Sequence, residues 1–205
     1  MNWEKIFIKE KAIWYYNHGD KYHVVTSHGE HMDFYLNTNY IVCNPKLTTN
    51  IVHNCFVPEI EQSKASIDWV VTYPPYGIPF AFELAKCLNS NFCYLLSRKQ
   101  KECFFNIKEG ENAVIVVDDI YSSRSLKNVI DFLREKKLRI HSKIFSIANF
   151  SGIERFAEVE IFSLLTKRLN RWDITECPMC KNGSNPVYHR SNWLRLIQNT
   201  ISVST

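Results

Sequence analysis

The sequence predicts an α/β protein built around a parallel β-sheet, and three observations support this. Between residues 68 and 165, short runs of apolar residues alternate with longer segments that have helical spacing. The apolar runs are continuous rather than alternating with polar residues, which is typical of strands in a sheet covered on both faces. Asp118 and Asp119 follow one of these runs, at the strand end where parallel sheets bind ligands.

The bulk composition is that of an ordinary globular protein. The chain has 205 residues, of which 45% are hydrophobic and 22% charged, and its formal net charge is +4. This length fits one α/β domain, alone or with a small annex. No apolar run approaches the ~18 residues of a membrane span, and charges interrupt residues 1–16, where a signal peptide would be apolar. We therefore expect a cytoplasmic protein with no membrane partner. The net charge suits an anionic small molecule as well as a nucleic acid, and a nucleic-acid partner is not expected.

The first third of the chain mixes strand and helix patterns. Residues 44–62 have apolar residues at Leu47, Ile51 and Cys55, which is helical spacing. We expect a helix over 3–17, strands over 22–27 and 33–37, and a helix within 44–62.

The central region repeats a strand–helix–strand pattern, which indicates parallel strands joined by crossover helices. Residues 125–137 form the clearest helix, because apolar residues recur at i, i+3, i+4 and i+7 and the end is basic. The predicted strands cover 68–73, 92–97, 113–119, 140–150 and 158–165, and the predicted helices cover 77–89 and 125–137.

The segment VIVVDDIYSSRSL, residues 114–126, carries the most chemical information. Backbone N–H groups at a helix start, with serine hydroxyls beside them, form an anion site. A sugar phosphate would use both halves of the segment, with ribose hydroxyls on Asp118 and Asp119 and the phosphate on the turn. On these residues alone, a simpler interpretation stays open, in which the acids end a strand and Ser125 caps a helix.

This segment resembles the phosphoribosyl-pyrophosphate (PRPP) motif of the type I phosphoribosyltransferases. Further stretches, in the same order as in that family, resemble the orotate phosphoribosyltransferases. They are residues 25–47 (substrate region), 68–85 (pyrophosphate loop and its helix), 95–119 (mobile loop leading into the PRPP strand) and 176–187 (Cys-Pro-x-Cys segment). The resemblance covers most of the chain and implies a type I phosphoribosyltransferase fold. It divides the chain into an N-terminal helix and substrate hood (1–67), a PRPP-binding core (68–165), and a tail that packs on the hood (166–205).

The resemblance also implies a reaction, in which PRPP with Mg²⁺ transfers its phosphoribosyl group to a pyrimidine base, inside a homodimer. It makes Lys99, Lys101, Asp118 and Asp119 the catalytic residues. The remaining implied PRPP-binding residues are Ser122, Ser123, Arg124, Ser125, Tyr73, Tyr76, Gly77 and Arg98, and the implied base-binding residues are Ser27, Phe34 and Tyr35. Judged without the resemblance, Phe34 and Tyr35 are favoured as core residues of a strand.

Two departures from the family pattern bear on activity. Arg124 and Tyr76 stand where the family has glycine, which allows positive φ and a close approach to phosphate. Three hypotheses follow: an orotate phosphoribosyltransferase, a weak or inactive PRPP- or nucleotide-binding regulator on the same fold, or a phosphoribosyltransferase for another base.

The chain has seven cysteines, an odd number that does not suit a disulfide framework. We expect Cys43, Cys55, Cys87 and Cys93 to be small core residues. Cys177 and Cys180 have metal-ligand spacing, but the sequence offers only His189 nearby as a third ligand. A reduced pair is favoured, and Zn²⁺ ligands or a redox pair stay open; for His28 and His31 we expect surface or substrate contacts.

Overall fold

The computed structural model describes residues 1–95, 106–122 and 124–201, and the chain divides into two compact units. Unit 1 contains residues 1–40 and 168–205, and unit 2 contains residues 41–167. The tail therefore folds with the N-terminal region. The other boundary lies at residue 41 instead of 68, because the helical segment after residue 44 packs on a helix of the core.

Unit 2 is built on a six-stranded sheet in the order β6-β5-β7-β8-β10-β9. Neighbouring strands are parallel except β9, which runs antiparallel to β10. This arrangement confirms the predicted α/β class. The strands are β5 (Trp69–Thr72), β6 (Asn91–Tyr94), β7 (Asn112–Ile120), β8 (Arg139–Asn149), β9 (Arg155–Phe156) and β10 (Val159–Thr166).

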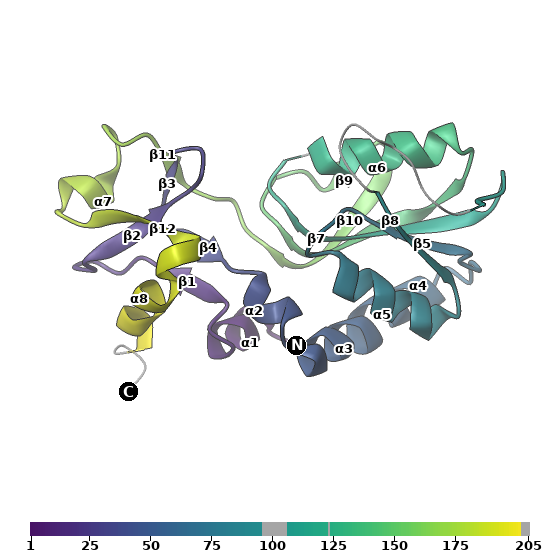
Figure 1. Ribbon diagram of the computed structural model, residues 1–205, viewed down its shortest axis with the longest axis horizontal. Helices are drawn as coiled ribbons and strands as arrows, with labels where there is room; N and C mark the ends of the chain where they lie inside the picture. The colour runs from purple at the N-terminus through teal and green to yellow at the C-terminus, as the bar shows by residue number, and fades with distance from the viewer. Residues whose placement is uncertain (96–105, 123, 202–205) are drawn as a thin grey trace. The chain divides into compact units, whose positions relative to one another are not determined.

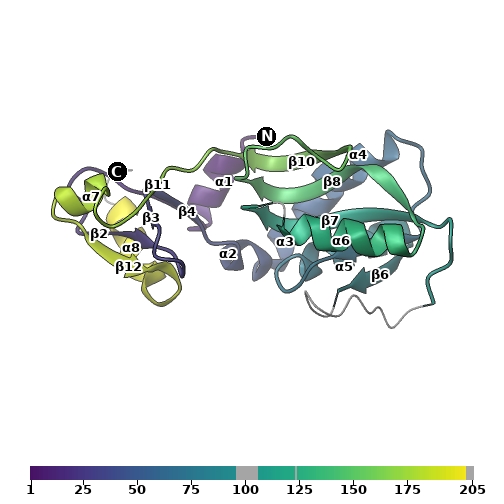
Figure 2. The ribbon, with the colours of Figure 1, turned by 90° about the horizontal axis from the view of Figure 1, so that it is seen from above.

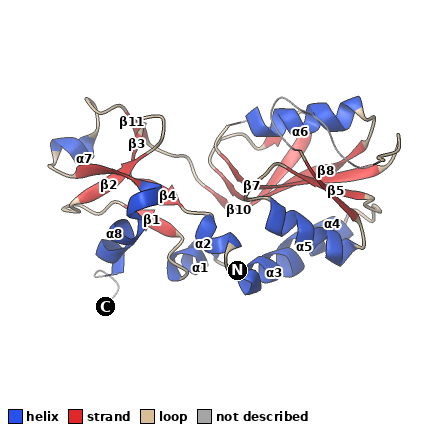
Figure 3. Ribbon diagram, viewed as in Figure 1, coloured by secondary structure: helices blue, strands red, loops and turns tan. Residues whose placement is uncertain are grey.

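Helices cover both faces of this sheet. Helix α6 (Arg124–Glu135) lies on one face, and α5 (Ile78–Leu88) lies on the other with α3 (Pro45–Ile51), the π-helical turn η1 (Val52–Phe56) and α4 (Val57–Glu61) (Figures 1 and 3). The predicted apolar stripe of α6 is buried, because Leu126, Val129, Ile130 and Leu133 all join the core beneath it. Burying each such side chain stabilises the fold by about 1.5–3 kcal/mol.

Unit 1 contains a four-stranded sheet in the order β11-β3-β2-β12 and a two-stranded sheet of β1 and β4. Its core joins both ends of the chain, since Trp14, Val24 and Met32 pack with Trp193 and Leu196. The elements, which Figure 2 shows from above, are α1 (Trp3–Lys9), β1 (Ile13–Tyr15), β2 (Tyr22–Val25), β3 (His31–Met32), β4 (Phe34–Leu36), β11 (Arg171–Trp172), α7 (Pro178–Lys181), β12 (Asn185–Tyr188) and α8 (His189–Ile201). Helix α2 (Asn39–Val42) contains the residues at which the units divide. Among the described residues, no helix has the length and apolar character to cross a membrane.

Two expectations about local structure were wrong. The predicted helix over 3–17 ends at Lys9, because Lys11 has a φ of 58° and the following residues form β1, which pairs antiparallel with β4. Of the four cysteines expected in the core, Cys93 is buried and Cys43 is exposed, while Cys55 and Cys87 are intermediate.

Candidate functional site

A pocket of about 250 Å³ lies where β5 and β7 end, and it is the candidate ligand site of unit 2. The two strands are parallel neighbours, with Thr72 paired to Val116, so the loops that follow them meet at one edge of the sheet. Parallel sheets bind their ligands at this edge. The lining residues are Tyr73, Pro74, Val117, Asp118, Asp119, Ile120, Tyr121, Ser122 and Leu126.

Asp118 and Asp119 both line the pocket, although they belong to opposite faces of β7. Val117 packs in the core beneath α6, so Asp119, two residues further on, belongs to the same face. Asp118 belongs to the face covered by α5. The pocket therefore opens over the end of the strand, where both carboxylates reach it from two sides.

The carboxyl group of Asp118 has an unusual pKa. Burial raises it to about 6, against hydrogen bonds from the backbone N–H groups of Asp119 and Asp118 that lower it. At neutral pH the group carries a negative charge in surroundings that disfavour one. A hydroxyl donor or a cation in the pocket would offset that cost, so the carboxylate is suited to bind such a ligand.

The turn after β7 leads directly into α6, which begins at Arg124 rather than at the predicted Ser125. Ser122 is exposed and lines the pocket, so its hydroxyl and the helix start lie at the same edge. Arg124 has helical backbone geometry, lies exposed and is not among the lining residues, so it does not fill the pocket. Ser123 and the side chain of Ser125 lie outside the described part of the structure.

The loop from β5 to α5 forms the other wall through Tyr73 and Pro74. Tyr76 is half-buried and is not among the lining residues. Gly77, the N-cap residue just before α5, lies close to the strand, since a Cβ there would lie 2.2 Å from Thr72 Oγ1 and 3.2 Å from the Tyr73 carbonyl oxygen. A larger residue at position 77 would push the loop away from β5, so glycine sets the position of this wall.

The predicted base-binding residues all lie in unit 1. Ser27 is exposed in the turn between β2 and β3. Tyr35 stacks on His189 with ring centroids 4.1 Å apart, and its hydroxyl lies 2.8 Å from His189 Nε2. Phe34 is 1% exposed and packs against Tyr15, so its ring belongs to the core and base stacking is not open to it.

The predicted loop residues Arg98, Lys99 and Lys101 lie outside the described residues. The sequence interpretation did not name five residues of the pocket wall, namely Pro74, Val117, Ile120, Tyr121 and Leu126. Pro74 and Tyr121 lie in the same two loops as the predicted residues. Both loops follow the ends of parallel strands, and this position could have identified the two residues as part of the pocket. Tyr121 packs on Phe150, with ring centroids 5.0 Å apart.

No family model matches the chain, but individual proteins of known function are similar to it in sequence. The chain is 28% identical to an orotate phosphoribosyltransferase of Thermoanaerobacter over 171 residues, which cover 80% of this chain and 86% of that protein. It is 26% identical to one of Campylobacter jejuni over 182 residues, or 80% and 89% of the two chains.

Solved structures share the fold. The orotate phosphoribosyltransferase of Aeropyrum pernix superposes with a TM-score of 0.61 at 16% identity, covering 79% of this chain and 92% of that one. The adenine phosphoribosyltransferase of Saccharomyces cerevisiae superposes with a TM-score of 0.57 at 18% identity, covering 78% and 99%. These likenesses show that the sheet and its helices have the architecture of the phosphoribosyltransferases.

Proposed function

We propose that this chain, a divergent member of the type I phosphoribosyltransferases, transfers the phosphoribosyl group of PRPP to a pyrimidine base and releases pyrophosphate. The observation that carries the proposal is the pocket in which Asp118, Asp119 and Ser122 meet at the start of α6. The likeness to orotate phosphoribosyltransferases over 80% of the chain supports the same reaction.

In the proposed complex, the two carboxylates bind the sugar. The hydroxyl groups of ribose donate hydrogen bonds to Asp118 and Asp119, whose negative charges lie near the ring on which positive charge develops during transfer. Groups fixed in advance near developing charge stabilise a transition state more than they stabilise the substrate. The raised pKa of Asp118 fits this role. Burial removes water from the carboxylate, and hydrogen-bond donors of the bound ligand would take the place of that water.

The start of α6 binds the 5′-phosphate of PRPP in this proposal. Ser122 donates its hydroxyl, and the backbone N–H groups of the first helical turn point toward the same edge. Arg124, exposed at that turn, adds a positive charge without entering the pocket. Tyr73 and Pro74 form the wall beside which pyrophosphate leaves.

Mg²⁺ fits the chemistry of this pocket, because it prefers carboxylate and phosphate oxygens and Asp118 and Asp119 supply carboxylates there. When bound with PRPP, the ion would neutralise charge on the departing pyrophosphate. The loop residues Arg98, Lys99 and Lys101 are proposed to act on the same pyrophosphate, and a homodimer is proposed as the working form.

A phosphoribosyltransferase for another base is the second candidate. The adenine phosphoribosyltransferases that share the fold favour it, as does the loss of Phe34 as a base platform. The third candidate, a regulator that binds PRPP with weak or no transfer, is motivated by Arg124 and Tyr76 in place of glycine. The expected order of events at the pocket is the same in all three until the base binds.

The experiment has two arms. Calorimetry with PRPP and Mg²⁺ should show binding to the full-length protein, a loss of at least tenfold in affinity for Asp119→Asn, and none for the control Asp131→Asn. Asp131 is a matched carboxylate because it lies in the same unit, pairs with Lys127 Nζ at 2.8 Å and does not line the pocket. Absence of binding to the unaltered protein would refute the proposal.

The second arm follows the absorbance of orotate after mixing with PRPP, and then tests other pyrimidines and purines. Consumption of orotate supports the first candidate. Turnover of another base alone supports the second, and PRPP binding without turnover of any base supports the third.

A further inference from the structure

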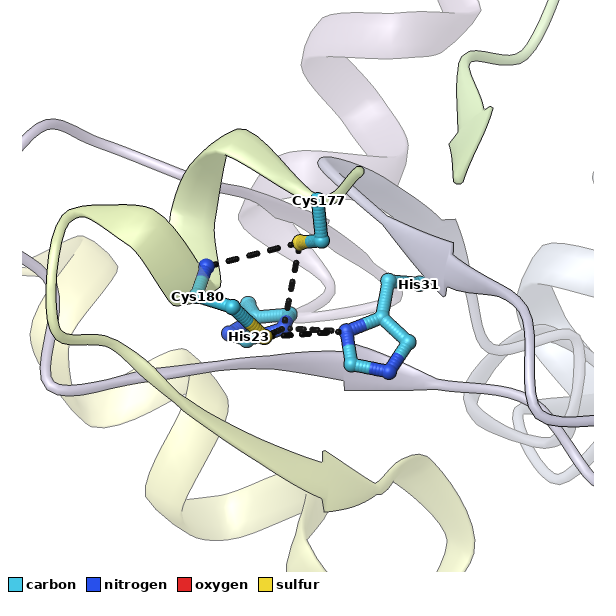
Figure 4. A group of neighbouring side chains, drawn as sticks. All are labelled: His23, His31, Cys177 and Cys180. Carbon is cyan, nitrogen blue, oxygen red and sulfur yellow. Dashed lines mark hydrogen bonds between the residues drawn. The ribbon is translucent and has the colours of Figure 1, made fainter. Parts of the chain in front are cut away.

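Two histidines and two cysteines, distant in the sequence, meet within unit 1 (Figure 4). His23 comes from β2, His31 from β3, and Cys177 and Cys180 from the turn that forms α7. One ligand atom from each residue lies within 4.8 Å of all the others. None of the four takes part in the pocket of unit 2, so the cluster calls for its own explanation.

The pairing of the strands brings the four side chains together. Val25 pairs with His31, and His23 lies two residues before Val25 on the same strand face, so the two histidines are diagonal neighbours. Strand β12 runs parallel to β2 and places Pro186 opposite His23. Because α7 immediately precedes β12, its two cysteines lie beside the same pair of strands.

We propose that this cluster binds one Zn²⁺ ion through His23 Nε2, His31 Nδ1, Cys177 Sγ and Cys180 Sγ. A tetrahedral zinc site with these ligands has ligand–ligand distances of about 3.3–3.8 Å, given Zn–N and Zn–S bonds of ~2.0 and ~2.3 Å. Three sulfur–nitrogen distances in the cluster are 3.6 Å for Cys177 to His23, 3.6 Å for Cys180 to His23 and 3.4 Å for Cys180 to His31. The two nitrogens lie 2.8 Å apart and would separate by about half an ångström on binding.

The turn that carries the cysteines has the form of a metal-binding knuckle. Cys177 is the N-cap of α7, and the backbone N–H of Cys180 points to its sulfur at 3.5 Å, which stabilises a thiolate. Pro178 occupies the first helical position, and Gly183, with a φ of +81°, turns the chain back toward β12. The spacing Cys-x-x-Cys then presents both sulfurs to one point.

The surroundings shield the two histidines from solvent. His23 is 0% exposed and His31 is 3% exposed, so bulk water does not compete for the ring nitrogens that would bind the metal. Ser184 Oγ lies 3.1 Å from His23 Nδ1, so with zinc bound at Nε2 the serine would accept the hydrogen that Nδ1 then carries. Cys177 is also fully buried, which excludes water from the sulfur.

The donor set selects zinc and a structural role. Two thiolates with two imidazoles suit Zn²⁺ rather than Mg²⁺ or Ca²⁺, which take oxygen ligands. Four protein ligands leave no open position for a substrate, as is usual at structural sites. The ion would link the hairpin of β2 and β3 to the C-terminal part of the chain. This link would stabilise unit 1, which is too small to be stabilised by a large hydrophobic core alone.

A second group, His53, Glu83 and Cys87, is a weaker candidate. His53 is exposed, and the group has three members among the described residues rather than four. Glu83 already pairs with Lys86 Nζ at 2.9 Å, which compensates its charge. This group therefore supplies the matched control for the test.

The test measures zinc by elemental analysis in the full-length protein, purified without a metal-affinity tag. We expect one zinc ion per chain in the unaltered protein and in the controls Cys87→Ser and Cys43→Ser, and near-complete loss in Cys177→Ser and His31→Ala. No zinc after purification, together with no uptake from a zinc titration, would overturn the proposal. Retention by Cys177→Ser with loss from Cys87→Ser would overturn it as well.

A spectroscopic measurement covers the outcome in which Cys177→Ser or His31→Ala does not fold. Replacing zinc by Co²⁺ in the unaltered protein should give the intense visible bands of tetrahedral cobalt and a sulfur-to-cobalt charge-transfer band. A weak spectrum typical of octahedral cobalt, or no charge-transfer band, would contradict ligation by two cysteines. Both readouts are independent of PRPP, so they test the zinc site whether or not the proposed reaction is correct.

Discussion

Replacing Asp118 by asparagine is expected to stabilise the ligand-free protein at neutral pH and to abolish PRPP binding at the same time. The substitution keeps the size and most of the hydrogen-bonding capacity of the side chain, but it removes a charge that burial disfavours. Since the charge is proposed to bind the ribose, the residue would serve function at a cost in stability.

The size of the effect follows from the pKa of Asp118, which burial raises from 3.8 to about 6. Well below pH 3.8 the carboxyl group is protonated in both the folded and the unfolded chain, and it has no net effect. As the pH rises to 6, the unfolded chain loses this proton and the folded chain retains it, so the free energy of unfolding falls. The two pKa values differ by about 2, which at ~1.4 kcal/mol per pH unit amounts to about 3 kcal/mol above pH 6.

Hydrogen exchange of peptides from β7 measures this effect, because it reports the opening of unit 2 by itself. Well below pH 3.8, Asp118→Asn and the unaltered protein should be equally stable, and near pH 7 the variant should be more stable by about 3 kcal/mol. Calorimetry should then show that the stabilised variant no longer binds PRPP. A stability difference that does not change with pH, or a variant less stable at pH 7, would refute this account of the pocket.

Three further predictions concern unit 2. Gly77→Ala should lower the free energy of unfolding by about 1–3 kcal/mol, because the new Cβ would lie 2.2 Å from Thr72 Oγ1; an unchanged urea midpoint would contradict this. Burial lowers the pKa of His141 below 6.5, so the unfolded chain binds this proton first and the protein loses stability as the pH falls below about 6.5. His141→Asn removes the group and should make this loss smaller. Melting curves whose pH dependence matches that of the unaltered protein would disprove the prediction. Arg124→Ala should weaken PRPP binding by up to about fivefold, because an exposed ion pair contributes at most ~1 kcal/mol. Tighter binding of PRPP to this variant in calorimetry would show that the arginine obstructs the phosphate instead.

The elements that the sequence predicted best are those whose pattern is local and periodic. The apolar stripe of α6 and the continuous apolar runs of β5 and β7 predicted a covered parallel sheet, and the structure has one. The position of Asp118 and Asp119 at a strand end also followed from the run of residues before them. Such features depend on neighbours within about ten residues, which a single sequence displays directly.

Other features depend on partners far along the chain. Residues 13–15 form a strand instead of extending the first helix because β4 offers antiparallel pairing, and nothing within residues 3–17 shows that partner. The strand pattern alone favoured a core position for Phe34, which the structure confirms, whereas the base-binding role came only from the resemblance. Residues 44–61 were correctly predicted to be helical, but their packing on α5, which assigns them to unit 2, is a tertiary fact.

The contrast between local features and features that depend on distant partners is clearest in the cluster of His23, His31, Cys177 and Cys180. The sequence by itself determined a parallel α/β core, a carboxylate pair at a strand end and a Cys-x-x-Cys turn, because each is encoded in adjacent residues. Only the tertiary structure decided that His23 and His31 face Cys177 and Cys180, across about 150 residues of chain. Strand pairing between the two ends of the chain places them there, and pairing of that kind is set by the folded core as a whole.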